Sequence, residues 1–189
     1  NLNNTNINVS LWLDNLQNGT SRLVINGSNV RFNTTALGNG THRFQVQAID
    51  PAGNGANSTL ITIFVDTVAP TLTADLPVNA TNTTDATPEI SVNVTDSVAL
   101  SAINVTLWLD GSRNASRLVD NNTNVRFNTT ALANGTHRAQ IEAIDTAGNG
   151  ANSTLITFFV DTVAPVLTAD LPVNATNTTD ATPEISVNV

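Results

Sequence analysis

The chain has 189 residues and a formal net charge of −8 at pH 7, and it contains no cysteine. The absence of cysteine excludes disulfides, thiolate metal sites and a cysteine nucleophile, and the acidic balance argues against binding to nucleic acid or anionic lipid. No apolar run approaches the roughly 18 residues of a membrane-spanning helix. A chain of this length is expected to form two domains of about 95 residues, each with one modest core.

Seven short segments between residues 70 and 160 alternate apolar and polar side chains with the period of a β-strand. In chain order they are residues 71–76, 88–95, 103–109, 117–119, 124–128, 136–144 and 154–160. Turn-forming residues separate them, at 110–111, 134–135 and 147–150. Because each segment has one apolar face and none has a helical period, the sequence predicts an all-β fold, an antiparallel sandwich of two sheets.

The chain contains an internal repeat. Residues 54–94 recur as residues 149–189, 95 positions further on, with Ile63 replaced by Phe158 and Thr71 by Val166 as the two differences. Such a repeat predicts tandem antiparallel sandwiches of about 95 residues per repeat. We expect residues 1–65 to form a domain that lacks its first two strands, residues 66–160 a complete domain, and residues 161–189 the first two strands of a further domain.

The two strands that the N-terminal domain is expected to lack are the same two that residues 161–189 are expected to supply. A sandwich without its first two strands would expose strand edges and an open core. Two explanations fit: a continuous array of repeats, or a donor-strand assembly in which the C-terminal strands of one copy complete the N-terminal domain of the next. A head-to-tail contact of this kind does not close, so both explanations predict a linear object. The glycine-free linkers at 66–70 and 161–165, each ending in proline, predict stiff joints.

Asparagine is unusually frequent. The chain has 28 Asn and 40 Ser plus Thr, and it contains 18 N-x-[S/T] sequons, about three times the number that this composition gives by chance. This density predicts a secreted, N-glycosylated surface, while the alternative is Asn-rich turn chemistry without sugar. The strand pattern places Asn93, Asn104 and Asn128 on polar faces, where a sugar would not enter the core. The sequon asparagines are Asn3, Asn8, Asn18, Asn26, Asn33, Asn39, Asn57, Asn79, Asn82, Asn93, Asn104, Asn114, Asn121, Asn128, Asn134, Asn152, Asn174 and Asn177.

Residues 134–149 (NGTHRAQIEAIDTAGN), followed by a strand and by VDTVAP at 160–165, resemble the end of bacterial and archaeal Ig-like repeats. Such repeats occur in tandem in adhesins, surface-layer-associated proteins and extracellular filaments. The resemblance covers the whole chain and implies an Ig-like sandwich at the cell surface. One departure is histidine, at His42 and His137, where the pattern usually has tyrosine. We expect each histidine to be a satisfied residue at the edge of the core.

Acidic residues are expected to meet where the linker enters the complete domain. In such a sandwich the linker lies at the same end as the loops that follow the second and sixth strands, which places Asp66, Asp96, Asp145 and Asn149 together. Several oxygen ligands at one point would suit Ca²⁺, which takes six to eight. The alternative is that these residues only shape their turns.

Two tryptophans, Trp12 and Trp108, fall on the polar faces of their strands. A bulge or register shift would turn them into the core. Otherwise we expect a lateral contact with a neighbouring rod or stacking beneath a sugar, because an exposed tryptophan implies a partner.

No Ser/His/Asp set, carboxylate pair or phosphate-binding glycine loop rises above chance, so no enzymatic activity is predicted. The sequence predicts a glycosylated extracellular structural protein that forms a filament, stalk or surface fibre from head-to-tail domains. Its expected partners are copies of itself or adjacent repeats, together with covalent N-glycans. Two alternatives remain: the repeat region of a cell-surface adhesin whose ligand-binding domain lies outside this chain, and an accessory domain of a secreted glycoside hydrolase.

Overall fold

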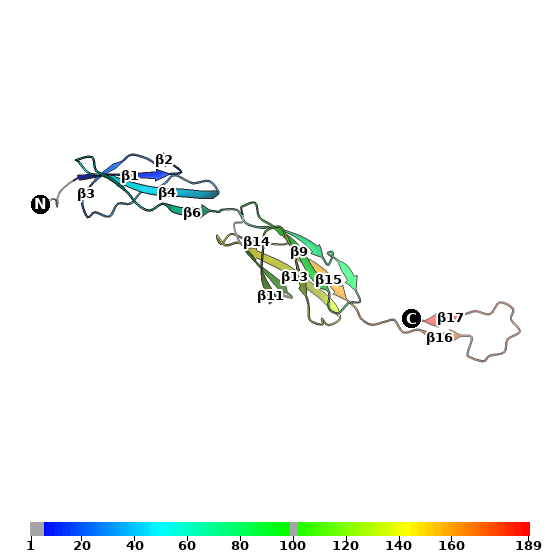
Figure 1. Ribbon diagram of the computed structural model, residues 1–189. Coiled ribbons are helices and arrows are strands. Elements are labelled where there is room, and N and C mark those ends of the chain that lie inside the picture. The colour runs from blue at the N-terminus through cyan, green and yellow to red at the C-terminus, as the bar shows by residue number, and fades with distance from the viewer. Residues whose placement is uncertain (1–5, 99–101) are drawn as a thin grey trace.

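The structure, a computed structural model, describes residues 6–98 and 102–189, so the predicted sequon at Asn3 lies outside the described residues. Every regular element among the described residues is a β-strand, and the strands form three successive units (Figure 1). We call these units the N-terminal sheet (β1–β6), the central sandwich (β7–β15) and the C-terminal hairpin (β16 and β17). Across the described ranges there is no helix with the length and apolarity needed to cross a membrane.

The central sandwich consists of two sheets. The smaller has the strand order β12-β9-β7, and the larger has the order β11-β10-β13-β15-β8, with β14 paired to β13. All neighbouring strands are antiparallel except β8 and β15, which are parallel. The strands are β7 (Thr71–Leu76), β8 (Thr81–Thr83), β9 (Glu89–Thr95), β10 (Ile103–Leu109), β11 (Ser112–Val119), β12 (Thr123–Asn128), β13 (Gly135–Ile144), β14 (Gly150–Asn152) and β15 (Ile156–Val160).

The core lies between these two sheets and follows the predicted alternation. Ile90, Val92 and Val94 on β9 are fully buried, and the alternate residues of β10 and β13 face them from the other sheet. Burial of apolar area at roughly 25 cal/mol per Å² is the main stabilising contribution of such a core. The all-β sandwich predicted from the sequence is therefore confirmed, as is the exposure of Asn93, Asn104 and Asn128 on the opposite faces.

Three details differ from the prediction. Strand β11 begins at Ser112 and is longer than the predicted segment 117–119, because it pairs along the whole of β10. Strands β8 and β14 were not predicted, since each has three residues and is held by backbone pairing to β15 or β13. Leu76, predicted to share the apolar face of β7, is 41% exposed because the register between β7 and β9 shifts after Ala74.

The N-terminal sheet repeats the larger sheet of the sandwich without a partner sheet. Strand β1 pairs with β2, β3 and β4, and β4 pairs with β5 and β6. Residues 28–33, which correspond to β12, form no strand, because no counterpart of β9 lies beside them. The strands are β1 (Asn6–Leu13), β2 (Leu16–Gln17), β3 (Arg22–Ile25), β4 (Gly40–Ile49), β5 (Gly55–Asn57) and β6 (Ile61–Val65).

The C-terminal hairpin pairs β16 (Thr168–Leu171) with β17 (Ser186–Asn188) in the manner of β7 and β9. Its apolar side chains have no sheet to cover them: Ile185 is 71% exposed and Val187 54% exposed. An isolated two-stranded hairpin is marginally stable in water, so these residues need a further partner to be buried.

The linker between the first two units is anchored on both sides. The Thr67 backbone N–H and hydroxyl both donate to Asn39 Oδ1, at 3.0 and 2.9 Å, and Asn149 Nδ2 donates to the Asp66 carbonyl at 3.1 Å. At the second linker, the Thr162 N–H and hydroxyl donate to Asn134 Oδ1 in the same way. These bonds support the predicted stiffness of the joints.

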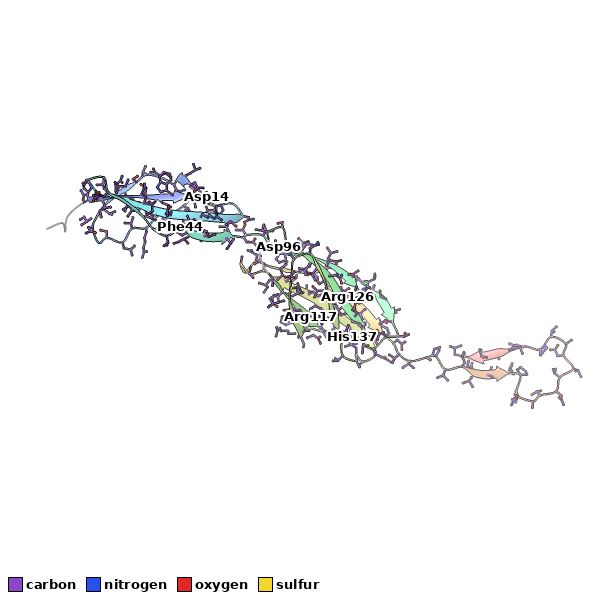
Figure 2. The ribbon with its side chains drawn as sticks, viewed as in Figure 1. Asp14, Phe44, Asp96, Arg117, Arg126 and His137 are labelled. Atoms are coloured by element: carbon purple, nitrogen blue, oxygen red, sulfur yellow. The ribbon has the colours of Figure 1, made fainter. Side chains whose placement is uncertain are left out.

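A histidine–aspartate clasp closes the first hairpin of each repeat. His137, which Figure 2 labels, contacts Asp110 Oδ2 through Nδ1 at 2.7 Å and the Ala133 carbonyl through Nε2 at 2.9 Å. Because both ring nitrogens face acceptors, the doubly protonated ring fits best, and the hydrogen bonds to Ala133 and Asp110 raise the pKa of His137 above its ordinary value of 6.5. Burial opposes ionisation of Asp110, but the hydrogen bonds from His137 and Arg138 outweigh it and lower the pKa of that carboxyl. His42 and Asp14 form the same clasp, so the expectation of a satisfied histidine is confirmed.

This clasp predicts a pH dependence. Because the pKa of His137 is raised in the folded state, its contribution to stability is complete below pH 6.5 and is lost as pH rises through the folded-state pKa. Because the pKa of Asp110 is lowered, its contribution is lost in the opposite direction, as pH falls below about 4. We expect Asp110→Asn to lower the pKa of His137 and leave that of His42 unchanged, as followed by NMR titration. The matched variant Asp14→Asn should do the reverse, and equal shifts of both rings in either variant would contradict a local clasp.

Candidate metal centre

Three aspartates from distant parts of the chain meet at the end of the central sandwich that the linker enters. Asp66 follows β6, Asp96 follows β9 and Asp145 follows β13, and one carboxylate oxygen from each lies within 4.8 Å of the others. Figure 2 labels Asp96 at this end of the sandwich, next to the N-terminal sheet. The structure thus brings together the three aspartates that the sequence placed there, and this is the one such group of acidic residues across residues 6–98 and 102–189.

Each carboxylate is oriented by its own backbone. Asp66 Oδ1 accepts the N–H of Val68 at 3.0 Å, and Asp96 Oδ1 accepts that of Val98 at 2.9 Å. Asp145 Oδ1 accepts the N–H of Asn149 at 2.9 Å. These turns hold one oxygen of each aspartate, and the second oxygen of Asp145 also accepts a hydrogen bond, from Asn149 Nδ2.

Asp96 is the most constrained member of the group. It is 7% exposed, and its Oδ2 is buried without a hydrogen-bond partner among the described residues. Asn121 fixes its backbone, accepting the Asp96 N–H at 2.7 Å and donating Nδ2 to the Asp96 carbonyl. A buried carboxylate oxygen without a partner costs free energy, and a cation bound at this position would remove that cost.

Asn149 occupies the predicted place in a different role. Its Nδ2 donates to Asp145 Oδ2 at 2.8 Å as well as to the Asp66 carbonyl, so its amide nitrogen is a hydrogen-bond donor within the cluster. Burial opposes ionisation of Asp145, but the hydrogen bonds from Asn149, Gly148 and Ala147 outweigh it and lower the pKa of the carboxyl. Asp145 is therefore held in the anionic form that a metal ion requires.

The donor set fits a hard divalent cation. Three ionised carboxylates with oxygens within 4.8 Å of one another repel one another. None of the ion pairs among the described residues involves them. Carboxylate oxygens are the ligands that Ca²⁺ prefers, and its six to eight positions leave room for carbonyl oxygens or water.

Sequence reasoning did not assign Asn121 to this centre. It identified Asn121 as a glycosylation sequon, because the N-x-T pattern is local, while its contact with Asp96 spans 25 residues. The signal that could have found it is position: Asn121 lies in the turn before β12, and β12 begins opposite the end of β9, next to Asp96.

The sequon asparagines are accessible. Of the seventeen that fall within the described residues, sixteen are exposed and Asn18 is half-buried. Several use their side-chain oxygen as an acceptor, as Asn39 and Asn134 do for the linker threonines. These hydrogen bonds do not involve the amide nitrogen, which is the atom that would carry an N-glycan. Asn121 is different, because its Nδ2 is the donor to Asp96.

Both tryptophans remain on the outer face of their sheet. Trp108 is 37% exposed and donates Nε1 to Glu142 at 3.2 Å, even though a bulge between β10 and β11 lies beside it. A groove of about 660 Å³ runs past Trp108, Arg138 and Leu155. The equivalent groove beside Trp12 is lined by the corresponding residues, including Arg43 and Leu60, so this surface recurs with the repeat.

Comparison with known families agrees with this architecture. Residues 76–162 match a bacterial Ig-like domain, and residues 26–115 match a bacterial Ig-like domain of group 3. Residues 26–162 thus carry bacterial Ig-like domains in tandem. Such families are typically non-enzymatic structural domains and are often found in extracellular proteins. No curated protein sequence matches the chain.

Solved structures that match the chain include the fibronectin(III)-like modules of Clostridium thermocellum CbhA, at 16% identity and a TM-score of 0.42, covering 81% of this chain and 77% of that chain. The FN1–FN3 domains of chicken CNTN1 match at 16% identity and a TM-score of 0.40, covering 84% of this chain and 57% of that chain. Dimeric latent PorU from Porphyromonas gingivalis matches at 14% identity and a TM-score of 0.35, covering 81% of this chain and 16% of that chain.

Proposed function

We propose that this chain is part of a glycosylated extracellular structural protein, in which Ig-like domains follow head to tail to form a filament, stalk or surface fibre. One observation carries the proposal. The N-terminal sheet presents an apolar face without a second sheet, and residues 166–189 repeat, with one substitution, the segment that covers the equivalent face of the central sandwich.

Either of two arrangements builds such a structure. In a continuous array, the covering segment comes from the preceding repeat of the same chain; in a donor-strand assembly it comes from a second copy. Both place successive sandwiches in line, because each contact is head to tail and does not close. Each module adds roughly 40 Å, judged from strands of eight to ten residues at about 3.3 Å per residue plus loops.

The mechanism is mechanical. Antiparallel sandwiches resist extension, and the bonds of Asn39 and Asn149 to the linker hold neighbouring modules at a fixed spacing. A Ca²⁺ ion held by Asp66, Asp96 and Asp145 would tie the linker to two loops of the sandwich and stiffen the joint further.

N-glycans complete the proposed surface, since they would shield strand edges and hinder proteolysis. Mass spectrometry of the sequon peptides from native material is expected to show glycans on most of the exposed asparagines. Occupancy should be lowest at Asn121, because a sugar on its Nδ2 would replace one hydrogen of the group that donates to the Asp96 carbonyl and would crowd that contact. Unmodified asparagines throughout would contradict the glycoprotein part of this proposal.

Images of the native material test the structural part. We expect linear particles with an axial repeat of roughly 40 Å per module. Compact particles without such a repeat would argue against a filament, stalk or fibre.

A second candidate function is the repeat region of an adhesin. The recurring grooves beside the half-buried Trp12 and the exposed Trp108 favour it, because an accessible tryptophan ring suits stacking on a sugar as well as a lateral contact between rods. Specific, saturable attachment of the chain to glycans or cells would support the adhesin, while absence of attachment would leave the structural role.

A further inference from the structure

The open face of the N-terminal sheet has the shape of an unfilled sandwich core. It contains a cavity of about 270 Å³ lined by apolar side chains, among them Leu11, Val30, Phe32, Phe44 and Ile63. The corresponding Leu107, Val125, Phe127, Ala139 and Phe158 are all 2% exposed or less in the central sandwich. There, β7 and β9 supply the cover.

The two core faces also carry side chains of nearly the same total volume. Phe44, Val46 and Ile63 stand where the sandwich has Ala139, Ile141 and Phe158, so the sets differ only by valine against alanine. The phenylalanine lies on β4 in the N-terminal sheet and on β15 in the central sandwich. These are adjacent positions in the core, since β4 pairs with β6 as β13 pairs with β15. A segment that packs on one of these faces therefore finds nearly the same volume to fill on the other.

The C-terminal hairpin supplies such a segment. Ile185, Val187 and Val189 are 71%, 54% and 87% exposed, whereas their counterparts Ile90, Val92 and Val94 are fully buried against the larger sheet. These three side chains therefore lack an apolar surface to cover them, and the N-terminal sheet presents such a surface.

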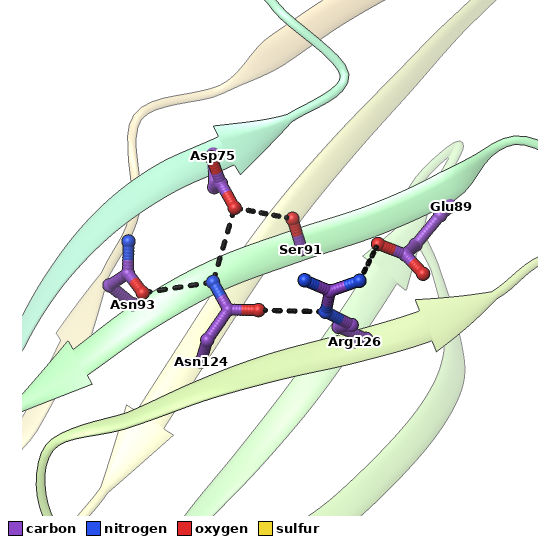
Figure 3. Close-up of polar contacts among 6 residues, drawn as sticks. All are labelled: Asp75, Glu89, Ser91, Asn93, Asn124 and Arg126. Carbon is purple, nitrogen blue, oxygen red and sulfur yellow. Dashed lines mark hydrogen bonds and ion pairs between the residues drawn. The ribbon is translucent and has the colours of Figure 1, made fainter.

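Polar contacts on the outer face specify the register. In the central sandwich, Asp75 Oδ2 accepts hydrogen bonds from Ser91 and Asn124, both at 3.1 Å (Figure 3). Asn124 also donates to Asn93 at 2.9 Å, which links β7, β9 and β12. Arg126 adds an ion pair to Glu89 at 3.3 Å.

Every member of this network has a counterpart in the two unpaired units. The C-terminal hairpin carries Asp170, Glu184, Ser186 and Asn188, and Ser186 already donates to Asp170 at 3.2 Å. The N-terminal sheet carries Asn29 and Arg31, the counterparts of Asn124 and Arg126.

Residues 28–33 already lie where β12 lies in the sandwich. The guanidinium of Arg22 stacks 5.2 Å from the Phe32 ring, as Arg117 does 5.5 Å from Phe127. The segment therefore needs only a strand partner to become an extended strand.

We infer that residues 166–189 of one copy of this chain bind the open face of the N-terminal sheet of a second copy. The pairing of β9 with β12 fixes the register: Val187 lies opposite Val30, and Asn188 lies opposite Asn29. This inference rests on the proposed function. Of its two arrangements, it assigns the donor-strand assembly between copies to residues 1–189.

Sedimentation velocity over a range of concentrations tests the inference with the full chain. Wild-type chains are expected to associate as concentration rises, and Val187→Asp should weaken association at least roughly a hundredfold, because a charge would enter the filled core. Val187 is exposed in the separate chain, so this variant should fold normally. The matched control is Val173→Asp, whose counterpart Val78 stays 66% exposed in the sandwich; this variant should associate like wild type.

Engineered cysteines test the register, since the chain has no cysteine of its own. Chains with Asn29→Cys mixed with chains with Asn188→Cys should form a mixed disulfide on oxidation, whereas Asn29→Cys with Glu184→Cys should not, because four residues along a strand separate those positions by about 13 Å. Equal yields in both mixtures, or equal effects of the two aspartate variants, would overturn the inference. Wild-type chains that stay monomeric while native material shows glycans and an axial repeat would refute exchange between copies and leave the proposed function standing.

Discussion

Replacing Phe127 with alanine should lower the free energy of unfolding of the central sandwich by about 3–5 kcal/mol. Phe127 is 1% exposed, it lies on β12 between the two sheets, and Arg117 stacks on its ring. Truncation removes the transfer free energy of the ring and leaves a cavity that the surrounding strands cannot fill. Urea denaturation followed by Trp108 fluorescence, in a background carrying Trp12→Phe, would report the sandwich alone.

The repeat supplies the control. Phe32 is the counterpart of Phe127, but it is half-buried on the open face of the N-terminal sheet. Phe32→Ala should leave the unfolding of the central sandwich unchanged. A Phe127→Ala variant as stable as wild type would mean that the two sheets do not share the core described above.

Calcium should raise the melting temperature of the central sandwich by more than about 10 °C at a hundredfold excess over its dissociation constant. Binding at that excess stabilises the folded state by about 2.7 kcal/mol, and each kcal/mol shifts the midpoint of a domain of this size by about 4–8 °C. The gain arises because the cation pairs the buried Asp96 Oδ2 and screens three carboxylates that repel one another. Differential scanning calorimetry with calcium and with chelator measures it.

Asp96→Asn should abolish this shift, and it should not destabilise the sandwich in chelator, since it removes the negative charge of a carboxylate whose buried Oδ2 has no hydrogen-bond partner among the described residues. Asp161→Asn is the matched control. Asp161 is the counterpart of Asp66 at the second linker and makes the same turn with Val163, but it belongs to no acidic group among the described residues. Identical melting of wild type with calcium and with chelator would end the calcium hypothesis.

How far the sequence predicts this structure depends on the range of the interaction. Strand β10 could be predicted to the residue, because Ile103, Val105 and Leu107 alternate strictly and all enter the core. Strand β8 could not, because its pairing with β15 joins segments about 75 residues apart and leaves no periodic signal in three residues.

The candidate metal centre shows the same division. Asp66, Asp96 and Asp145 were found together because the sandwich topology alone brings their loops to one end. The roles of Asn121 and Asn149 depend on which side-chain atom faces the cluster, and sequence pattern does not encode that orientation. The outward position of Trp108 followed from alternation, while its bond to Glu142 followed only from the geometry of neighbouring strands.

The core phenylalanine lies at Phe44 in the first module and at Phe158 in the second, which are different positions of the repeat. This difference bears on how such chains evolve. Because the covering segment is almost invariant and each face offers it nearly equal room, one module can be substituted for another without a new fit being needed. Recombination that adds or deletes whole 95-residue units would then alter the reach of the protein while every boundary between modules keeps its chemistry.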